Sequence, residues 1–194
     1  MTKAANRKRE QQRGSVISSV FEWVDSVVLA LVIVMLLFTL FINKVEVKGT
    51  SMESTLSEGD QLIITDFNYK PKQGDIIIIS RNYLNTEVSA AESKTPIVKR
   101  VIATEWQTVE IKDGKVYVDG AALDEPYYSG ITSVMDTSVK YPVTVEEGMV
   151  FVMGDNRPHS KDSRSSDLGQ VPFDAVIGKA KLRIWPLNKL GFVE

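Results

Sequence analysis

A long apolar stretch near the N-terminus constrains the fold of this chain more than any other feature. It runs from about Val27 to Ile42, interrupted only by Thr39, and Trp23 and Phe21 extend it upstream. A helix needs about 20 apolar residues to cross roughly 30 Å of hydrocarbon. We therefore predict one transmembrane helix over residues 19–42, with the tryptophan at the membrane interface.

A cleaved secretory signal peptide is the alternative, because such peptides also combine a basic start with an apolar run. No Ala-x-Ala-like cleavage site follows the stretch, and residues 43–47 alternate in the manner of a β-strand. These two features favour an uncleaved anchor.

The charges that precede the stretch predict its orientation. Residues 1–18 contain one acid, Glu10, and the basic residues Lys3, Arg7, Lys8, Arg9 and Arg13. Basic residues flanking a membrane segment stay on the cytoplasmic side. We expect a single-pass protein of the cell membrane, with residues 1–18 in the cytoplasm and residues 43–194 outside it.

The composition excludes several classes of protein. The formal net charge is −2 and the chain shows no basic face, so nucleic acid is not an expected partner. The chain has no cysteine and one histidine, which rules out disulfides and argues against a metal site. We expect no cofactor. The roughly 150 residues after the stretch suffice for one domain with its own core.

Beyond residue 42 the hydrophobic pattern is that of β-strands, and no long amphipathic helix pattern occurs. The runs that predict strands are 61–65, 76–79, 97–103, 108–111, 115–118, 149–153 and 180–185. Asp113-Gly114 predicts a hairpin between two of them. We therefore predict a mainly β fold, with one compact all-β domain over residues 43–194 and non-local strand pairing. The polar stretches 83–94 and 127–141 predict mobile surface loops.

Two residues stand out as candidates for catalysis. Ser51 follows Gly49 closely and lies only a short extended chain beyond the apolar stretch, so it must be near the membrane. Lys99 shares a strand face with Ile97 and Val101, and burial among such neighbours would lower its pKa toward the range of a general base. A lysine on an edge strand, with its ammonium in water, is the alternative.

A third segment, residues 154–164, reads Gly-Asp-Asn-Arg-Pro-His-Ser-Lys-Asp-Ser-Arg. Its composition alone fits a solvated loop, but the order of its residues is specific. Together, the Ser51 segment, the Lys99 strand and this run resemble type I signal peptidases, which are membrane-bound serine proteases with a Ser/Lys dyad. The resemblance extends from Ser19 to about Phe192.

The resemblance implies a catalytic role for three residues. Ser51 matches the nucleophile, Lys99 the general base, and Ser160 the hydroxyl that orients the lysine. The backbone N–H of the nucleophile would also donate to the oxyanion.

The resemblance further implies two structural ion pairs that hold the floor of the site. One would join Asp155 to Arg100, and the other would join Asp162 to Arg164.

The substrates implied are signal-peptide-bearing precursor proteins, cut after small residues of the Ala-x-Ala type at the outer face of the cytoplasmic membrane. Met52, Ile97 and Val98 match substrate-binding positions, and the peptide would add to a sheet edge near residues 94–98. The expected partners are these precursors and the lipid bilayer, and the expected state is a monomer.

Three positions depart from the family pattern. Ser54 stands where members commonly have a turn proline, and residues 105–107 replace a Pro-Gly-Asp turn after the lysine strand. Gly49 stands where some members place a serine hydroxyl in the oxyanion hole, so the sequence identifies no second oxyanion donor.

Other interpretations are weaker. His159 follows a proline at an open position of the motif, which favours a solvent-exposed residue over a member of a Ser-His-Asp triad. A catalytically silent membrane-anchored domain that assists secretion or pilus assembly is the alternative function, but Ser51, Lys99 and Ser160 are intact. A self-cleaving repressor-type protease would need a DNA-binding domain, and none is visible.

Overall fold

The computed structural model describes residues 21–35, 43–66, 69–84 and 95–193. The chain divides into two compact units, Met1–Ile42 and Asn43–Glu194. In the first unit, residues 21–35 are helical and their side chains are exposed. The remainder of the predicted segment 19–42 lies outside the described residues. Over the four described ranges, no helix is both long enough and apolar enough to cross a membrane.

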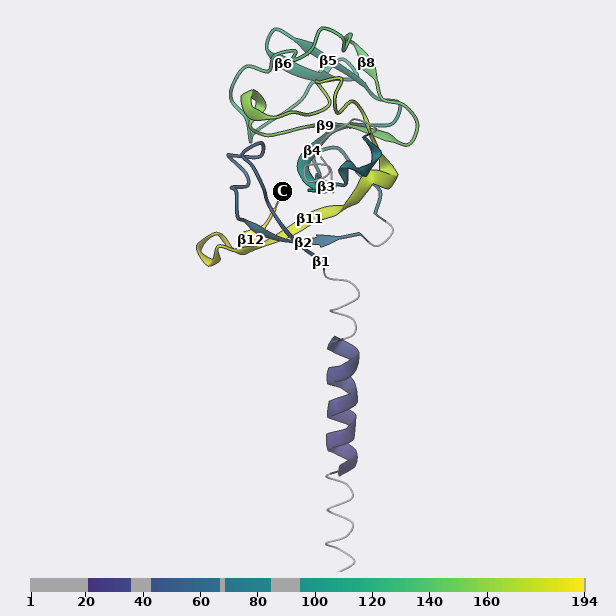
Figure 1. Ribbon diagram of the computed structural model, residues 1–194, viewed down its shortest axis with the longest axis vertical. Helices are drawn as coiled ribbons and strands as arrows, with labels where there is room; N and C mark the ends of the chain where they lie inside the picture. Colours follow the sequence, from purple (N-terminus) through teal and green to yellow (C-terminus); the bar gives the residue numbers. More distant parts are fainter. Residues whose placement is uncertain (1–20, 36–42, 67–68, 85–94, 194) are drawn as a thin grey trace, which may run out of the picture. The chain divides into compact units, whose positions relative to one another are not determined.

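The second unit is mainly β, as predicted (Figure 1). Its longer strands are β1 (Asn43–Glu46), β2 (Gln61–Thr65), β3 (Ile76–Ile79), β4 (Ile97–Thr104), β5 (Thr108–Lys112), β6 (Lys115–Val118), β9 (Met149–Met153) and β11 (Val176–Trp185). Two-residue strands are β7 (Ala121–Ala122), β8 (Val143–Thr144), β10 (Val171–Pro172) and β12 (Gly191–Phe192). Short 3-10 turns are η1 (Arg81–Tyr83), η2 (Arg157–His159), η3 (Phe173–Ala175) and η4 (Leu187–Lys189).

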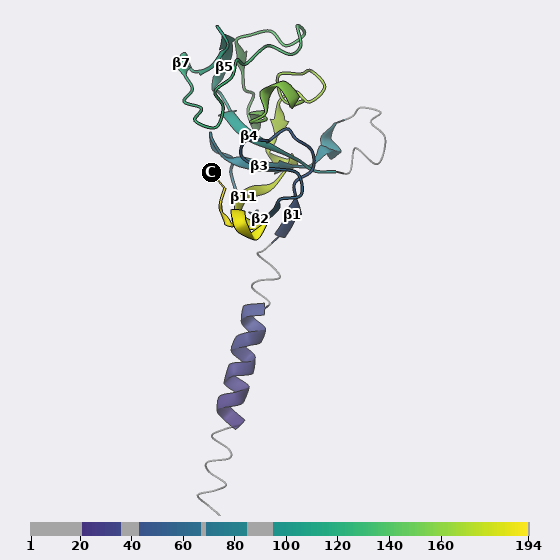
Figure 2. The same ribbon diagram turned by 90° about the vertical axis from the view of Figure 1, so that its left-hand side faces the viewer.

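The strands form two antiparallel sheets. The larger has the order β1-β2-β11-β3-β4-β9-β10, with β12 paired to β11, and the smaller has the order β7-β6-β5-β8. In both views the smaller sheet lies at one end of this unit, and β1, β2 and β11 lie at the other (Figures 1 and 2). β11 comes late in the sequence but lies between β2 and β3 in the sheet, which is the non-local pairing that the sequence predicts.

The predicted strands coincide with the observed ones to within a residue, except at β11. That strand begins at Val176, four residues before the predicted start. The interruption in the pattern is Gly178, which weakens a strand prediction because it has no side chain to pack. The pairing with β3 shifts register between Val176 and Gly178, and a Cβ at the glycine would collide with the Thr65 carbonyl. A bulge therefore accommodates the glycine inside one continuous strand.

The smaller sheet is built around the predicted hairpin. Asp113 and Gly114 have φ values of 50° and 76°, and they join β5 to β6 with Lys112 opposite Lys115. Positive φ at both central residues is the geometry of the tight turn that matches the twist of paired strands. The hairpin prediction is confirmed.

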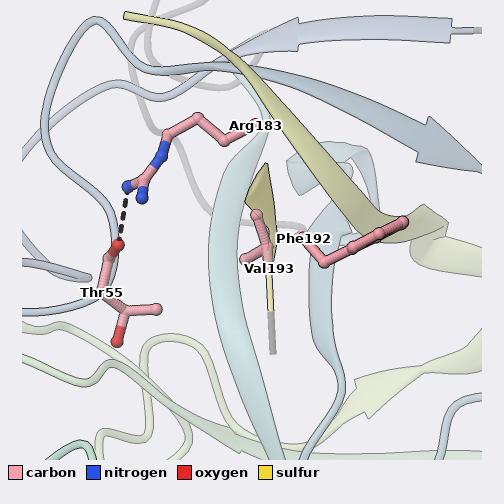
Figure 3. A pocket seen from close by; sticks show the side chains of 4 residues that line it. All are labelled: Thr55, Arg183, Phe192 and Val193. Carbon is pink, nitrogen blue, oxygen red and sulfur yellow. Dashed lines mark hydrogen bonds between the residues drawn. The ribbon is translucent and has the colours of Figure 1, made fainter. Parts of the chain in front are cut away.

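A pocket of about 440 Å³ opens beside β12 and is lined by Thr55, Arg183, Phe192 and Val193 (Figure 3). Arg183 donates to the Thr55 carbonyl and to the Asp60 carboxylate, so β11 is fastened to the chain that follows β1.

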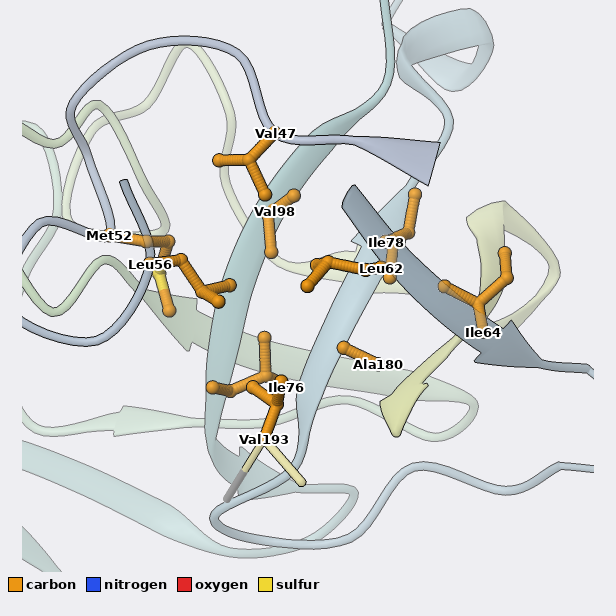
Figure 4. Close-up of a cluster of buried hydrophobic side chains, with 10 residues drawn as sticks. All are labelled: Val47, Met52, Leu56, Leu62, Ile64, Ile76, Ile78, Val98, Ala180 and Val193. Carbon is orange, nitrogen blue, oxygen red and sulfur yellow. The ribbon is translucent and has the colours of Figure 1, made fainter. Parts of the chain in front are cut away.

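Among the described residues, three clusters of buried apolar side chains support the domain. The cluster nearest β2 contains Val47, Met52, Leu56, Leu62, Ile64, Ile76, Ile78, Val98, Ala180 and Val193 (Figure 4). A second lies on the opposite side of β3, with Ile77, Ile79 and Val101 among its members. Successive side chains of β3 point to opposite faces of the sheet and enter two different clusters, which is why all four of its isoleucines are buried.

One of the two predicted surface loops is partly buried. Residues 127–141 form no helix or long strand, as predicted, but Thr132 is only 2 % exposed and Tyr127 is half-buried. The prediction of a surface position is therefore wrong for these two residues. Their partners come from segments distant in sequence, which local patterns do not reveal. In the other loop, residues 85–94 lie outside the described residues.

Trp106 adopts a strained backbone conformation in the turn between β4 and β5. Its φ is 70° and its side chain is 66 % exposed, so packing does little to offset the strain. It occupies the middle of residues 105–107, where the family pattern has glycine.

We predict that Trp106→Gly raises the free energy of unfolding by about 1 kcal/mol, because glycine adopts this φ without a Cβ clash. Urea unfolding of the full chain in detergent measures the change. Trp106→Ala keeps the strain and serves as the control. A less stable glycine variant would contradict the prediction.

Candidate active site

Ser51 lies in a turn that two buried side chains anchor to the core. The backbone N–H groups of Thr55 and Leu56 donate to the Met52 carbonyl at 3.0 and 2.8 Å. Met52 and Leu56 themselves are buried beside Val98 (Figure 4). These contacts fix the turn that carries the serine, residues 50–56, to the core. We call it the serine turn.

The structure brings Lys99 to Ser51. Lys99 lies on β4 opposite Ile77, and its side chain is almost completely buried, with the residue 3 % exposed. Its Nζ lies 2.5 Å from the Ser51 Oγ, within hydrogen-bonding distance. The alternative interpretation, a lysine that reaches water from an edge strand, does not fit this burial.

The surroundings of Lys99 lower its pKa to about 8. Burial is the main cause, because it disfavours the charged ammonium. The Asp162 carboxylate acts in the opposite direction, and the Arg164 guanidinium again lowers the pKa. The lysine is therefore substantially neutral at mildly alkaline pH, as a proton acceptor must be.

The predicted pair of Asp155 and Arg100 forms with bidentate geometry. Arg100 Nε and Nη2 donate to the two carboxylate oxygens at 2.9 and 2.8 Å, and Nη1 donates to the Gly74 carbonyl. Asp155 is 1 % exposed and also accepts the Thr55 hydroxyl at 2.5 Å. The charged groups of this buried pair thus all have hydrogen-bond partners. A buried ion pair needs such partners to offset the cost of removing its charges from water.

The second predicted pair, Asp162 with Arg164, also forms. Arg164 Nε and Nη2 donate to the Asp162 carboxylate at 2.8 and 2.9 Å, and the Gly154 N–H donates to it at 3.0 Å. The carboxylate thus fixes the start of the 154–164 segment.

Gly154 separates the serine turn from Ser160. A Cβ at this position would collide with the Ser160 side chain and with the Ser51 carbonyl oxygen. The neighbouring Asn156 N–H donates to that same carbonyl at 3.0 Å. The close approach of the two segments therefore requires glycine.

Ser160 is buried next to this contact, but its Oγ has no hydrogen-bond partner among the described residues. Its role in orienting Lys99 stays a prediction. His159 is exposed, and its ring nitrogen Nδ1 lies 3.2 Å from the Asn156 side chain.

Sequence reasoning missed a segment, residues 125–132, that contacts Arg100 and a further buried arginine. The Tyr127 ring stacks on the Arg100 guanidinium at 3.9 Å. Arg157, 1 % exposed, pairs with Glu125 and donates to the Thr132 hydroxyl at 2.7 Å. Two adjacent tyrosines after an acid were the available signal, since aromatic rings stack on guanidinium groups.

The predicted substrate-binding residues are close in sequence to Ser51 and Lys99. Val98 is buried and Ile97 is half-buried on β4, and Met52 lies in the core beneath the serine turn. The register pairs β4 residues 97–100 with β3 but only residues from 100 onward with β9. Neither Ser51 nor Lys99 lines the pocket beside β12.

Comparison with known families places the chain by sequence. The family model described as signal peptidase, peptidase S26, matches residues 20–185. This chain belongs to that peptidase family.

Its relatives include signal peptidase I from Bacillus licheniformis, which is 34 % identical over 89 % of this chain and 92 % of that protein. Signal peptidase I T from Bacillus subtilis is 32 % identical over 98 % of both chains. A crystal structure of a signal peptidase I from Enterococcus faecalis has 30 % identity and a TM-score of 0.44, and the match covers 57 % of this chain and 97 % of that one.

Proposed function

We propose that this chain is a membrane-anchored serine endopeptidase that removes signal peptides from exported precursor proteins, with Ser51 as nucleophile and Lys99 as general base. The observation that carries the proposal is the 2.5 Å separation of the two reactive atoms, with the lysine buried. The names of the relatives support the substrate class.

In the proposed mechanism neutral Lys99 accepts the hydroxyl proton as the Ser51 Oγ attacks the scissile carbonyl carbon. The Ser51 N–H stabilises the oxyanion. When the C–N bond breaks, the lysine ammonium returns the proton to the leaving amine. A water, deprotonated in turn by neutral Lys99, then attacks the acyl-enzyme ester, and the lysine ammonium returns this proton to the Ser51 Oγ as the ester bond breaks. Ser160 orients the amine, and the Asp155 and Asp162 pairs hold the floor of the site.

The substrate is proposed to bind as an added strand. Residues 97–99 of β4 pair with β3 on one side only, which leaves backbone groups for an extended peptide. Small side chains at the first and third positions before the cut would fit beside Ile97 and Val98.

The proposed anchor is the apolar segment 19–42. Its described part, residues 21–35, is helical with exposed apolar side chains, such as those of Trp23 and Met35. A large uncovered apolar surface is costly in water and favourable in a bilayer. The proposed topology has residues 1–18 in the cytoplasm and the domain 43–194 outside.

The chemistry predicts how activity depends on pH and on the base. The value of kcat/KM should rise with pH through an apparent pKa of about 8, since only the neutral lysine accepts a proton. Lys99→Arg should lose cleavage as fully as Lys99→Ala and Ser51→Ala, because a guanidinium stays protonated. Initial rates on a synthetic signal peptide measure this.

Each variant is first shown to be folded by thermal melting in detergent. His159→Ala is the control and should leave the pH profile unchanged. Near-native turnover of Lys99→Arg, or an inactive but folded His159→Ala, would rule out the dyad.

The binding mode predicts the cleavage preference. A peptide with Ala at the first and third positions before the bond should be cut, and replacement of the first Ala by Phe should abolish cutting. Mass spectrometry of the products identifies the bond. Efficient cleavage after Phe or Arg would refute this binding mode.

The topology predicts the pattern of protease accessibility. Protease added outside spheroplasts should digest the domain 43–194 and leave an N-terminal tag intact, as read by immunoblot. Protection of the domain until the cells are lysed would show that the orientation is wrong.

A further inference from the structure

We propose that Ser54 and Thr55 are positioning residues, whose two hydroxyls hold the serine turn in register with the strand that carries Lys99. The proposal rests on the proposed function of Ser51 and Lys99. Neither residue touches the reacting atoms, and both act through the group of side chains around Arg100.

The Thr55 hydroxyl connects the turn to the buried ion pair. Its Oγ1 donates to Asp155 Oδ2 at 2.5 Å, and the same oxygen accepts Arg100 Nη2 at 2.8 Å. The Thr55 N–H is engaged by the Met52 carbonyl, and its own carbonyl accepts Arg183. The backbone on both sides of this hydroxyl is thus fixed, so its bond to the carboxylate sets where the turn lies.

The Ser54 hydroxyl makes a second connection to the same arginine. Its Oγ donates to the Tyr127 carbonyl at 3.1 Å, and the Tyr127 ring lies 3.9 Å from the centre of the Arg100 guanidinium. Ser54 has a φ of 95°, a conformation that a residue with a Cβ adopts only under strain. Proline cannot reach this φ, so the backbone here excludes the residue common in the family pattern.

The Thr55 bond ends on the carboxylate partner of Arg100, and the Ser54 bond ends on the backbone of the tyrosine whose ring packs on Arg100. Arg100 directly follows Lys99 in β4. Through Arg100 the two bonds link the serine turn to β4, and the two reactive residues on these segments, Ser51 and Lys99, are 48 positions apart in the sequence. A hydrogen bond between nucleophile and base requires this relative placement, and displacement by about 1 Å can lower a rate by about 100-fold. The two hydroxyls therefore control the distance between Oγ and Nζ.

Ser54→Gly separates positioning from simple structural support. Glycine removes the hydroxyl and also relieves the positive φ, so stability should rise or stay constant while kcat falls. A residue that only supports the fold would move both quantities in the same direction. Trp106→Gly is the matched control, because it relieves the same kind of strain far from the dyad and should leave kcat unchanged.

The experiment uses the full chain in detergent and a synthetic Ala-x-Ala signal peptide that the wild type cleaves and Ser51→Ala does not. We expect kcat to fall about tenfold or more in Ser54→Gly and in Thr55→Val, with KM changed less than twofold. Thr55→Ser retains the hydroxyl and should recover most of kcat. The pH at half-maximal kcat/KM should not move, because no titrating group is removed.

Wild-type kcat in Ser54→Gly, or equal losses of kcat in Thr55→Ser and Thr55→Val, would overturn the proposal while leaving the dyad in place. A displaced pH profile would also overturn it, since the effect would then pass through charge. If Thr55→Val does not fold, Ser54→Gly and Thr55→Ser decide the outcome. A wild type that cleaves no such peptide, or a Ser51→Ala variant that does, would overturn the proposed function and this inference together.

Discussion

The buried ion pair between Arg100 and Asp155 is the interaction on which the rest of the site depends. It joins residues 55 positions apart, so it closes a long loop and sets β4 against the segment that follows β9. A buried charge left without its partner is strongly destabilising, typically by about 3–5 kcal/mol. Because the Thr55 hydroxyl, the Gly74 carbonyl and the Tyr127 ring all use this pair, its geometry fixes theirs.

The cationic side chains of the site differ in whether a carboxylate pairs with them. Arg100, Arg157 and Arg164 each form an ion pair with a carboxylate, whereas no carboxylate of the described chain lies within ion-pair distance of Lys99. Arginine suits these pairs because its planar group binds both carboxylate oxygens and stays protonated. With the nearby acids held by arginines, burial dominates at the lysine and lowers its pKa.

Sequence patterns predicted the parts of the fold that are local. Short alternating or β-branched apolar runs located β2, β3, β6 and β9, and a dipeptide located the hairpin, because both signals depend on neighbouring residues. The approach of Ser51 to Lys99 came from the resemblance, since no local rule connects residues so far apart. The Tyr127 contacts, the Thr55 bond and the positive φ of Ser54 depend on tertiary packing, which single-residue patterns do not encode. Of the predicted anchor 19–42 the structure describes residues 21–35, and residues 85–94 lie outside the described residues.

The contacts of Tyr127 and Arg157 have a consequence for how this protein loses function on heating. Tyr127 and the partners of Arg157, Glu125 and Thr132, lie in the chain that runs from β7 to β8 of the smaller sheet, whereas Lys99 lies on the larger sheet and Ser51 on the serine turn. Proteins open in cooperative units of unequal stability. If the smaller sheet opens first, it withdraws the ring from Arg100 while the larger sheet is still paired. Inactivation would then precede global melting, and a melting temperature would overstate the range in which the enzyme works.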